Sequence, residues 1–417
     1  MENAVPVRGF GAAVGFALTA LVSLAFGGAM AVQPALFAGA LTPYAQAWIY
    51  LMIFGFGFSA VFAVIYAALP LIFGVPLQSR QAAFMHYGLH LAGLSVLLLV
   101  PFVPDLPQAR MMTLLIFCGV LVFVWNVGAS LRRMVRPDAA SAFIVTACLW
   151  LLVAAVMGPP APGEPVLQAL VGTRWMSGWL VFVVAGVFFN TLFALALRLL
   201  QDDPQSRRKR EATGWYAFAV INLGVAWSFA GVAVGPVSLL VATVCIFAAG
   251  TLVLVWDVLD LQRRSGLVPG SYAKVLSSVL CAVPFAAALL IIWAGQTAWN
   301  APVAAEAQLA ADASQAAPIP PTVKALEWAT GLFAFFVVAV PGLIAGVFLL
   351  LATRRKQDSR VRTAPAFAAY SAGAVMLVLG AGLSQKELFA CGGVVLCLAA
   401  LGFLRDLVTA VCAARED

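Results

Sequence analysis

Long apolar stretches separated by short polar loops recur along the chain. Most of these stretches hold about 20–30 residues, and about 20 apolar residues in a helix are enough to cross the ~30 Å hydrocarbon core of a bilayer. No run shows the alternation of an outer-membrane strand. The pattern predicts an all-α integral membrane protein with about twelve transmembrane helices. The expected spans are residues 9–37, 47–73, 83–102, 111–131, 140–158, 175–200, 214–234, 237–259, 272–296, 325–352, 366–384 and 388–412.

The basic residues test this number of spans and give an orientation, because Lys and Arg are enriched in cytoplasmic loops. With both termini placed inside, all but four of the 24 Lys and Arg residues fall on the cytoplasmic side. The exceptions are Arg110, Arg174, Lys324 and Lys386. A missed span would destroy this bias. We therefore expect twelve spans, with both the N- and C-termini on the cytoplasmic side of a bacterial-type inner membrane.

Composition agrees with a membrane protein. Hydrophobic residues make up 63% of the chain and charged residues 10%, whereas soluble domains average roughly 45–50% and about 25%. The net charge of +7 follows from the basic cytoplasmic loops, so membrane lipid is the expected partner and nucleic acid is not. The seven cysteines form no CxxC pair, which favours packing over metal binding or disulfides.

The pattern predicts a single polytopic domain with one long external loop. Residues 297–323, TAWNAPVAAEAQLAADASQAAPIPPTV, are rich in Ala and Pro. An ordinary surface loop is favoured here over a partner-docking segment. The other loops are short, so we expect no separate domain outside the membrane.

His86 and His90 are the two histidines of the chain, and they are the first candidates for a site. Four residues apart, they share one face of the third expected span. This spacing places two ligands on one metal in HExxH helices. No Asp, Glu or Cys nearby in sequence completes a ligand set, so we favour imidazoles that hydrogen-bond to neighbouring helices and predict no metal site.

Three carboxylates also lie in or near the expected spans. A carboxylate inside a membrane is a functional candidate by default, because burying it costs about 2.5–3.5 kcal/mol at the centre of a helix. Asp257 and Asp260 occupy the last turn of the eighth expected span, beside Arg263 and Arg264. Interfacial ion pairs are the favoured interpretation. Glu327 lies about one helical turn inside the outer boundary of the tenth expected span, because each residue of a helix adds a rise of ~1.5 Å.

Other polar residues suggest contacts between helices. Arg405 and Asp406 are expected to form an ion pair near the end of the last span. Asn126, Asn190 and Asn222 lie deeper, where asparagine commonly hydrogen-bonds between helices. No chain of acidic groups crosses the bilayer, and no catalytic constellation is recognisable, so intrinsic catalysis is not expected.

Residues 51–93, LMIFGFGFSAVFAVIYAALPLIFGVPLQSRQAAFMHYGLHLAG, carry a resemblance to a known family. They resemble the second and third helices of the haem–copper oxidase subunit I superfamily, including oxidase-like and nitric-oxide-reductase-like members. The shared features are the GFGF run, the helix end IYAALP and the short loop into a helix bearing aromatic residues and histidine. The resemblance covers about a tenth of the chain and implies an oxidase-like bundle, for which twelve spans with both ends inside also fit.

The family's cofactor ligands are missing at the corresponding positions. Where members carry a haem-ligating histidine near the outer end of the second span, this chain has Trp48 or Tyr50. The sixth, seventh and tenth expected spans also lack the family's histidines. Two haems and a copper need about six histidines in that family, and this chain has two. The resemblance thus implies a degenerate scaffold, with no cofactor expected, although haem ligation by Tyr, His or Met stays open.

Three functions follow from these observations. The leading hypothesis is a structural or accessory subunit of a respiratory-type membrane complex, with other membrane subunits as partners. The first alternative is a twelve-helix secondary transporter, since the basic loop QDDPQSRRKREA after the sixth span resembles a link between two six-helix halves. The second alternative is a redox membrane protein that binds haem or a metal through His86 and His90.

Overall fold

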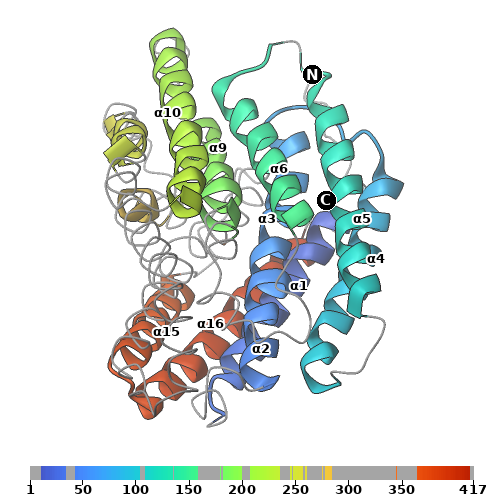
Figure 1. The fold of residues 1–417 in the computed structure, drawn as a ribbon, viewed down its shortest axis with the longest axis vertical. Coiled ribbons are helices and arrows are strands. Elements are labelled where there is room, and N and C mark those ends of the chain that lie inside the picture. The colour runs from blue at the N-terminus through green and yellow to red at the C-terminus, as the bar shows by residue number, and fades with distance from the viewer. Residues whose placement is uncertain are drawn as a thin grey trace.

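The computed structural model shows a bundle of helices (Figure 1). It describes residues 11–33, 43–103, 109–134, 136–157, 179, 182–199, 207–234, 245–246, 248–256, 259–260, 275, 278–283, 344 and 364–413. Every regular element in this part of the chain is helical. The main helices are α1 (Gly11–Met30), α2 (Pro43–Tyr50), η3 (Leu51–Phe58), α3 (Ser59–Leu71), α4 (Arg80–Leu99), α5 (Ala109–Leu131), α6 (Ala139–Met157), η5 (Phe182–Phe189), α9 (Asn190–Leu199), α10 (Arg207–Val234), α15 (Ala364–Gly382) and α16 (Lys386–Ala413).

Seven helices among the described residues are long and apolar enough to cross a membrane. Together they make this a multi-pass, all-α membrane protein. They match the first five and the last two expected spans. Expected spans nine and ten lie mostly outside the described residues, as does the loop 297–323, and about half of span eight does. The total of twelve spans and the orientation of the termini therefore stay predictions.

Several helix ends differ from the expected ones for local reasons. Helix α1 ends at Met30, earlier than the expected residue 37, shortly before a Gln33–Pro34 step that disfavours helical backbone at the residue before the proline. Helix α4 begins at Arg80 and not at residue 83, because Ser79 caps it by accepting a hydrogen bond from the amide of Ala82 at 3.1 Å.

The second span is the centre of the described bundle. Residues Ala47–Leu71 form one continuous helical rod of α2, η3 and α3, and almost all of its residues are buried. In the other six spans, about half of the residues or fewer are buried. Their outer faces expose apolar side chains such as Leu114, Leu121 and Trp125, as a lipid-facing surface requires. Groups on the second span are thus shielded from both water and lipid.

The first helix, α1, and the last two, α15 and α16, pack closely through small residues. Helix α16 packs against both α1 and α15, and Figure 1 shows this C-terminal pair beside the N-terminal helices. A Cβ atom on Gly28 would lie 2.6 Å from the carbonyl oxygen of Gly393, and one on Gly392 would lie 2.9 Å from that of Gly373. These glycines let helix backbones touch, which is a common way to join helices in a membrane.

Candidate functional site

The middle of the second span is a π-helix. Segment η3 is eight residues long and sits between α2 and α3 without a break. π-Helical turns are rare and frequently lie at functional sites. The pattern of apolar residues did not predict this segment. The GFGF run, with Gly55 and Gly57 inside η3, was the available signal.

His90 lies against the end of this π-helix. Its Nε2 is 2.9 Å from the hydroxyl oxygen of Ser59, and its ring also faces the backbone of Phe54. The Ser59 hydroxyl donates to the carbonyl of Phe54 at 3.5 Å. Ser59 thus bonds both to the carbonyl of Phe54 and to Nε2 of His90. The imidazole therefore joins α4 to the junction between η3 and α3.

His86 makes an equivalent contact one turn earlier on α4. Its Nδ1 is 3.1 Å from the hydroxyl oxygen of Tyr66 on α3. Three phenylalanine rings surround the imidazole, with ring centroids 4.5 Å (Phe62), 4.8 Å (Phe16) and 5.2 Å (Phe123) away. His86 is 1% exposed and His90 is 3% exposed. Both histidines therefore act as polar connectors inside an apolar aromatic cage.

Asn126 extends this polar contact to the loop before α4. Its side chain faces the hydroxyl of Tyr66, and it binds both backbone groups of Ser79. The Ser79 amide donates to Oδ1 at 3.0 Å, and Nδ2 donates to the Ser79 carbonyl at 2.9 Å. Ser130 also accepts from the amide of Gln78 at 2.8 Å. The loop between the second and third spans is thus fastened to α5.

Asn190 and Asn222 form a second polar group, beside the π-helix η5. Asn190 follows η5 directly, and its Nδ2 donates to the carbonyls of Ala185 (3.1 Å) and Gly186 (2.8 Å). Asn222 of α10 donates to Oδ1 of Asn190 at 3.1 Å and accepts from the indole Nε1 of Trp150 at 2.9 Å. The two asparagines therefore connect α6, α9 and α10.

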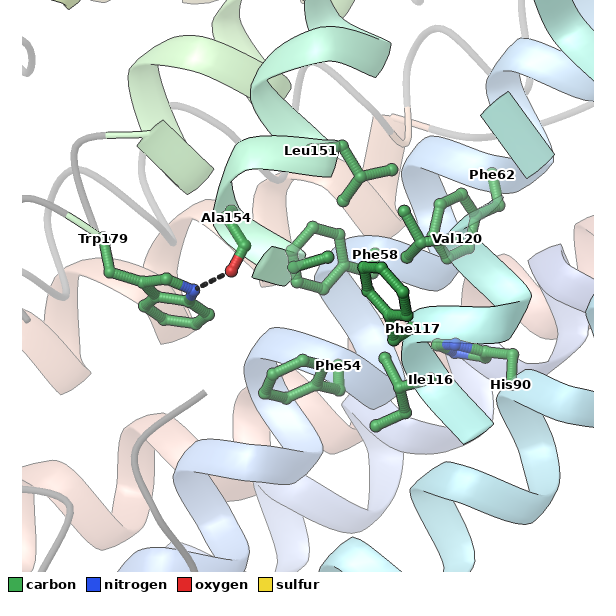
Figure 2. Close-up of a pocket in the computed structure, with 11 residues that line it drawn as sticks. Phe54, Phe58, Phe62, His90, Ile116, Phe117, Val120, Leu151, Ala154 and Trp179 are labelled. Atoms are coloured by element: carbon green, nitrogen blue, oxygen red, sulfur yellow. Dashed lines mark hydrogen bonds between the residues drawn. The ribbon is translucent and has the colours of Figure 1, made fainter. Parts of the chain in front are cut away.

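A small apolar cavity lies beside His90 (Figure 2). Phe54 and Phe58 of η3 line it together with Val120 and Trp179, whose indole Nε1 donates to the carbonyl of Ala154 at 3.0 Å. The empty space is about 430 Å³ when the open mouth is included. The part that the centres of water molecules can occupy is only about 30 Å³. At roughly 10–15 Å³ for each water, it has room for about two.

A haem of the kind that members of the resembled family carry does not fit these residues. The cavity beside His90 is far too small for a porphyrin, and close aromatic packing fills the surroundings of His86. One nitrogen of each imidazole already bonds to a hydroxyl. Among the described residues, no three His, Cys, Asp or Glu side chains lie close enough to hold a metal ion.

An ion pair that the sequence analysis missed joins three helices at one end of the bundle. Nη1 of Arg198 on α9 lies 2.9 Å from Oδ2 of Asp138, and its Nε donates to the carbonyl of Ile72 at 3.3 Å. Asp138 also accepts from the amide of Ser141 at 2.8 Å and so caps α6. No sequence signal pointed to this pair, because 60 residues separate its members.

The remaining candidates are only partly within the described structure. The Arg405–Asp406 ion pair is confirmed, with Nη2 and Oδ1 3.0 Å apart. Asp260 is half-buried. Asp257 and Glu327 lie outside the described residues, as do the arginines expected to pair with the eighth span.

Comparison with known proteins assigns this chain to no family. No family model matches this chain, and no curated sequence is significantly similar to it.

Proposed function

We propose that this protein is a structural or accessory subunit of a respiratory-type membrane complex, an oxidase subunit I-like scaffold without a redox centre of its own. The observation that carries the proposal is the engagement of both histidines. His86 bonds to Tyr66 and His90 to Ser59, so the two imidazoles hold the second and third spans together.

The contacts around the histidines support a scaffold more than a catalyst. A metal ligand needs a free lone pair on an imidazole nitrogen and room for the metal and its other ligands. At His90, Nε2 already bonds to the Ser59 hydroxyl, and the rings of Phe16 and Phe62 lie beside the imidazole. At His86, rings of Phe16, Phe62 and Phe123 take up the neighbouring volume. These residues stiffen the centre of the bundle.

The proposal is tested by purifying the tagged protein from its native membrane in a mild detergent. We expect a native mass larger than that of the 43.8 kDa chain, a stoichiometric membrane-protein partner, and no Soret band belonging to this chain. The double variant His86→Leu, His90→Leu is the control for cofactor content. A stoichiometric haem or metal that the wild type holds and the double variant loses would overturn the proposal and favour the redox alternative. A lone chain without partners would also overturn it.

One observation favours the transporter as a second candidate. Transporters often break their helices near the middle of the membrane, where free backbone groups bind substrate or ions. Segments η3 and η5 interrupt the α-helical pattern at buried positions. Yet Ser59 and Asn190 already bind carbonyls in these segments. Substrate-dependent uptake by proteoliposomes holding only this chain would favour transport over the scaffold.

A further inference from the structure

The two π-helices share one arrangement. Segments η3 and η5 are each eight residues long, and each continues directly into an α-helix whose first residue is polar. In both, this residue donates to the carbonyl five positions earlier. Ser59 binds the carbonyl of Phe54 at 3.5 Å, and Asn190 binds that of Ala185 at 3.1 Å. A side chain thus supports the π register at the same point of both segments.

A second element holds each of these polar residues in place. His90 of α4 binds Ser59 with 2.9 Å between Nε2 and the hydroxyl oxygen. Asn222 of α10 binds Asn190 with 3.1 Å between Nδ2 and Oδ1. The register of each π-helix is therefore coupled to the position of a neighbouring span.

The two π-helices also touch each other and have free space beside them. The ring centroid of Phe58, the last residue of η3, lies 5.6 Å from that of Phe188 in η5. Phe54 and Phe58 form one wall of the cavity (Figure 2). This cavity has room for about two water molecules, which is too little for a larger ligand.

A change from π to α register has a defined geometric result. An α-helix has 3.6 residues per turn and rises 1.5 Å per residue, whereas a π-turn closes between residues i and i+5. Returning one such turn to the α register rotates the preceding segment by about 100° and shifts it by about 1.5 Å. In the second span the preceding segment is α2. Its Trp48 donates to the Gly27 carbonyl of α1 at 2.9 Å, and this bond does not survive such a rotation.

We propose that η3 and η5 are a coupled pair of register switches, and that exchange of η3 between π and α registers moves α2 against α1. The Ser59–His90 and Asn190–Asn222 bonds hold the π state described here. This device goes beyond the scaffold function. It is a property of the isolated chain, so its test does not depend on any partner.

The test follows the indole of Trp48 by ¹⁹F NMR of the full-length chain in nanodiscs, labelled with 5-fluorotryptophan. Loss of the resonance in Trp48→Phe assigns it. In Ser59→Ala we expect a second Trp48 resonance and at least a tenfold faster exchange of the indole N–H. The matched control is Ser95→Ala on α4, because the Ser95 hydroxyl is exposed and bonds only to Leu91 within its own helix. This control should behave as the wild type does.

Wild-type protein gives a second measurement that needs no variant. Backbone amides of residues 51–58 should exchange with deuterium at least tenfold faster than those of residues 59–69, although both segments are buried. Equal protection of the two segments would overturn the proposal. A folded Ser59→Ala protein with a single wild-type Trp48 resonance would also overturn it.

Discussion

Replacing Tyr66 by phenylalanine removes one hydroxyl and keeps the shape of the ring. That hydroxyl lies 3.1 Å from Nδ1 of His86 and also faces Asn126. Tyr66 and His86 are each 1% exposed, so neither water nor lipid replaces the lost bond. The substitution leaves a polar ring nitrogen without this partner inside a cage of aromatic side chains.

The size of the effect follows from two known ranges. Side-chain hydrogen bonds between membrane helices contribute about 0.6 kcal/mol on average and up to about 1.7 kcal/mol. A buried polar group that loses its partner costs about 1–3 kcal/mol. Because the site is almost fully buried, we expect the free energy of unfolding of Tyr66→Phe to fall by about 1–2 kcal/mol.

The assay is reversible unfolding in mixed micelles, with a double-mutant cycle. The variants are Tyr66→Phe, His86→Leu and both together, and the expected coupling energy is about 0.6–1.7 kcal/mol. Tyr87→Phe is the control, since its half-buried hydroxyl bonds to Thr19 at 3.2 Å nearer the surface, and it should cost less. A loss below about 0.3 kcal/mol for Tyr66→Phe, or fully additive effects, would refute a structural role for the His86–Tyr66 bond.

Two further substitutions test the packing of the bundle in the same unfolding assay. Gly393→Ala places a Cβ 2.5 Å from the carbonyl oxygen of Gly28 and should lower the free energy of unfolding by about 1–3 kcal/mol. Its control, Gly128→Ala, meets nothing within 4 Å and should be neutral or stabilising by up to about 1 kcal/mol, so equal losses in both would contradict the packing argument. Arg198→Met keeps an unbranched, flexible apolar stem, although a shorter one, and leaves Asp138 without its ion pair. Because these side chains are only 23% and 18% exposed, we expect a loss of about 1–2 kcal/mol, between the ranges for exposed and buried pairs, and an unchanged stability would show that the pair is not formed in the membrane.

The helical membrane architecture was predictable because the length of an apolar run is a direct consequence of the thickness of the bilayer. The positions of the helix ends were less predictable. Ser79 adds a turn to α4 through its cap, and a single capping residue is a weaker sequence signal than the apolar run that follows it. The π-helices were not predicted. Apart from the two glycines of the GFGF run, their apolar segments have the pattern of an ordinary helix, and tertiary contacts such as His90–Ser59 show which register they adopt.

The candidate site was predictable in one part. The spacing of His86 and His90 placed both on one face of a helix, and the lack of nearby carboxylates and cysteines favoured hydrogen bonds over a metal. The partners were not foreseeable, because Tyr66 and Ser59 are 20 and 31 residues away in sequence. Which face of the second span meets α4 depends on the register of η3, and that is a property of the folded bundle.

The most direct test of the scaffold account uses the fact that the chain has only two histidines. Protein labelled with ¹⁵N-histidine gives ring-nitrogen signals from His86 and His90 alone. We expect diamagnetic signals from two hydrogen-bonded imidazoles, with Nδ1 of His86 perturbed in Tyr66→Phe and Nε2 of His90 perturbed in Ser59→Ala, and no change after treatment with a chelator or a reductant. Signals broadened or shifted by a bound metal or haem, and restored by its removal, would contradict the account.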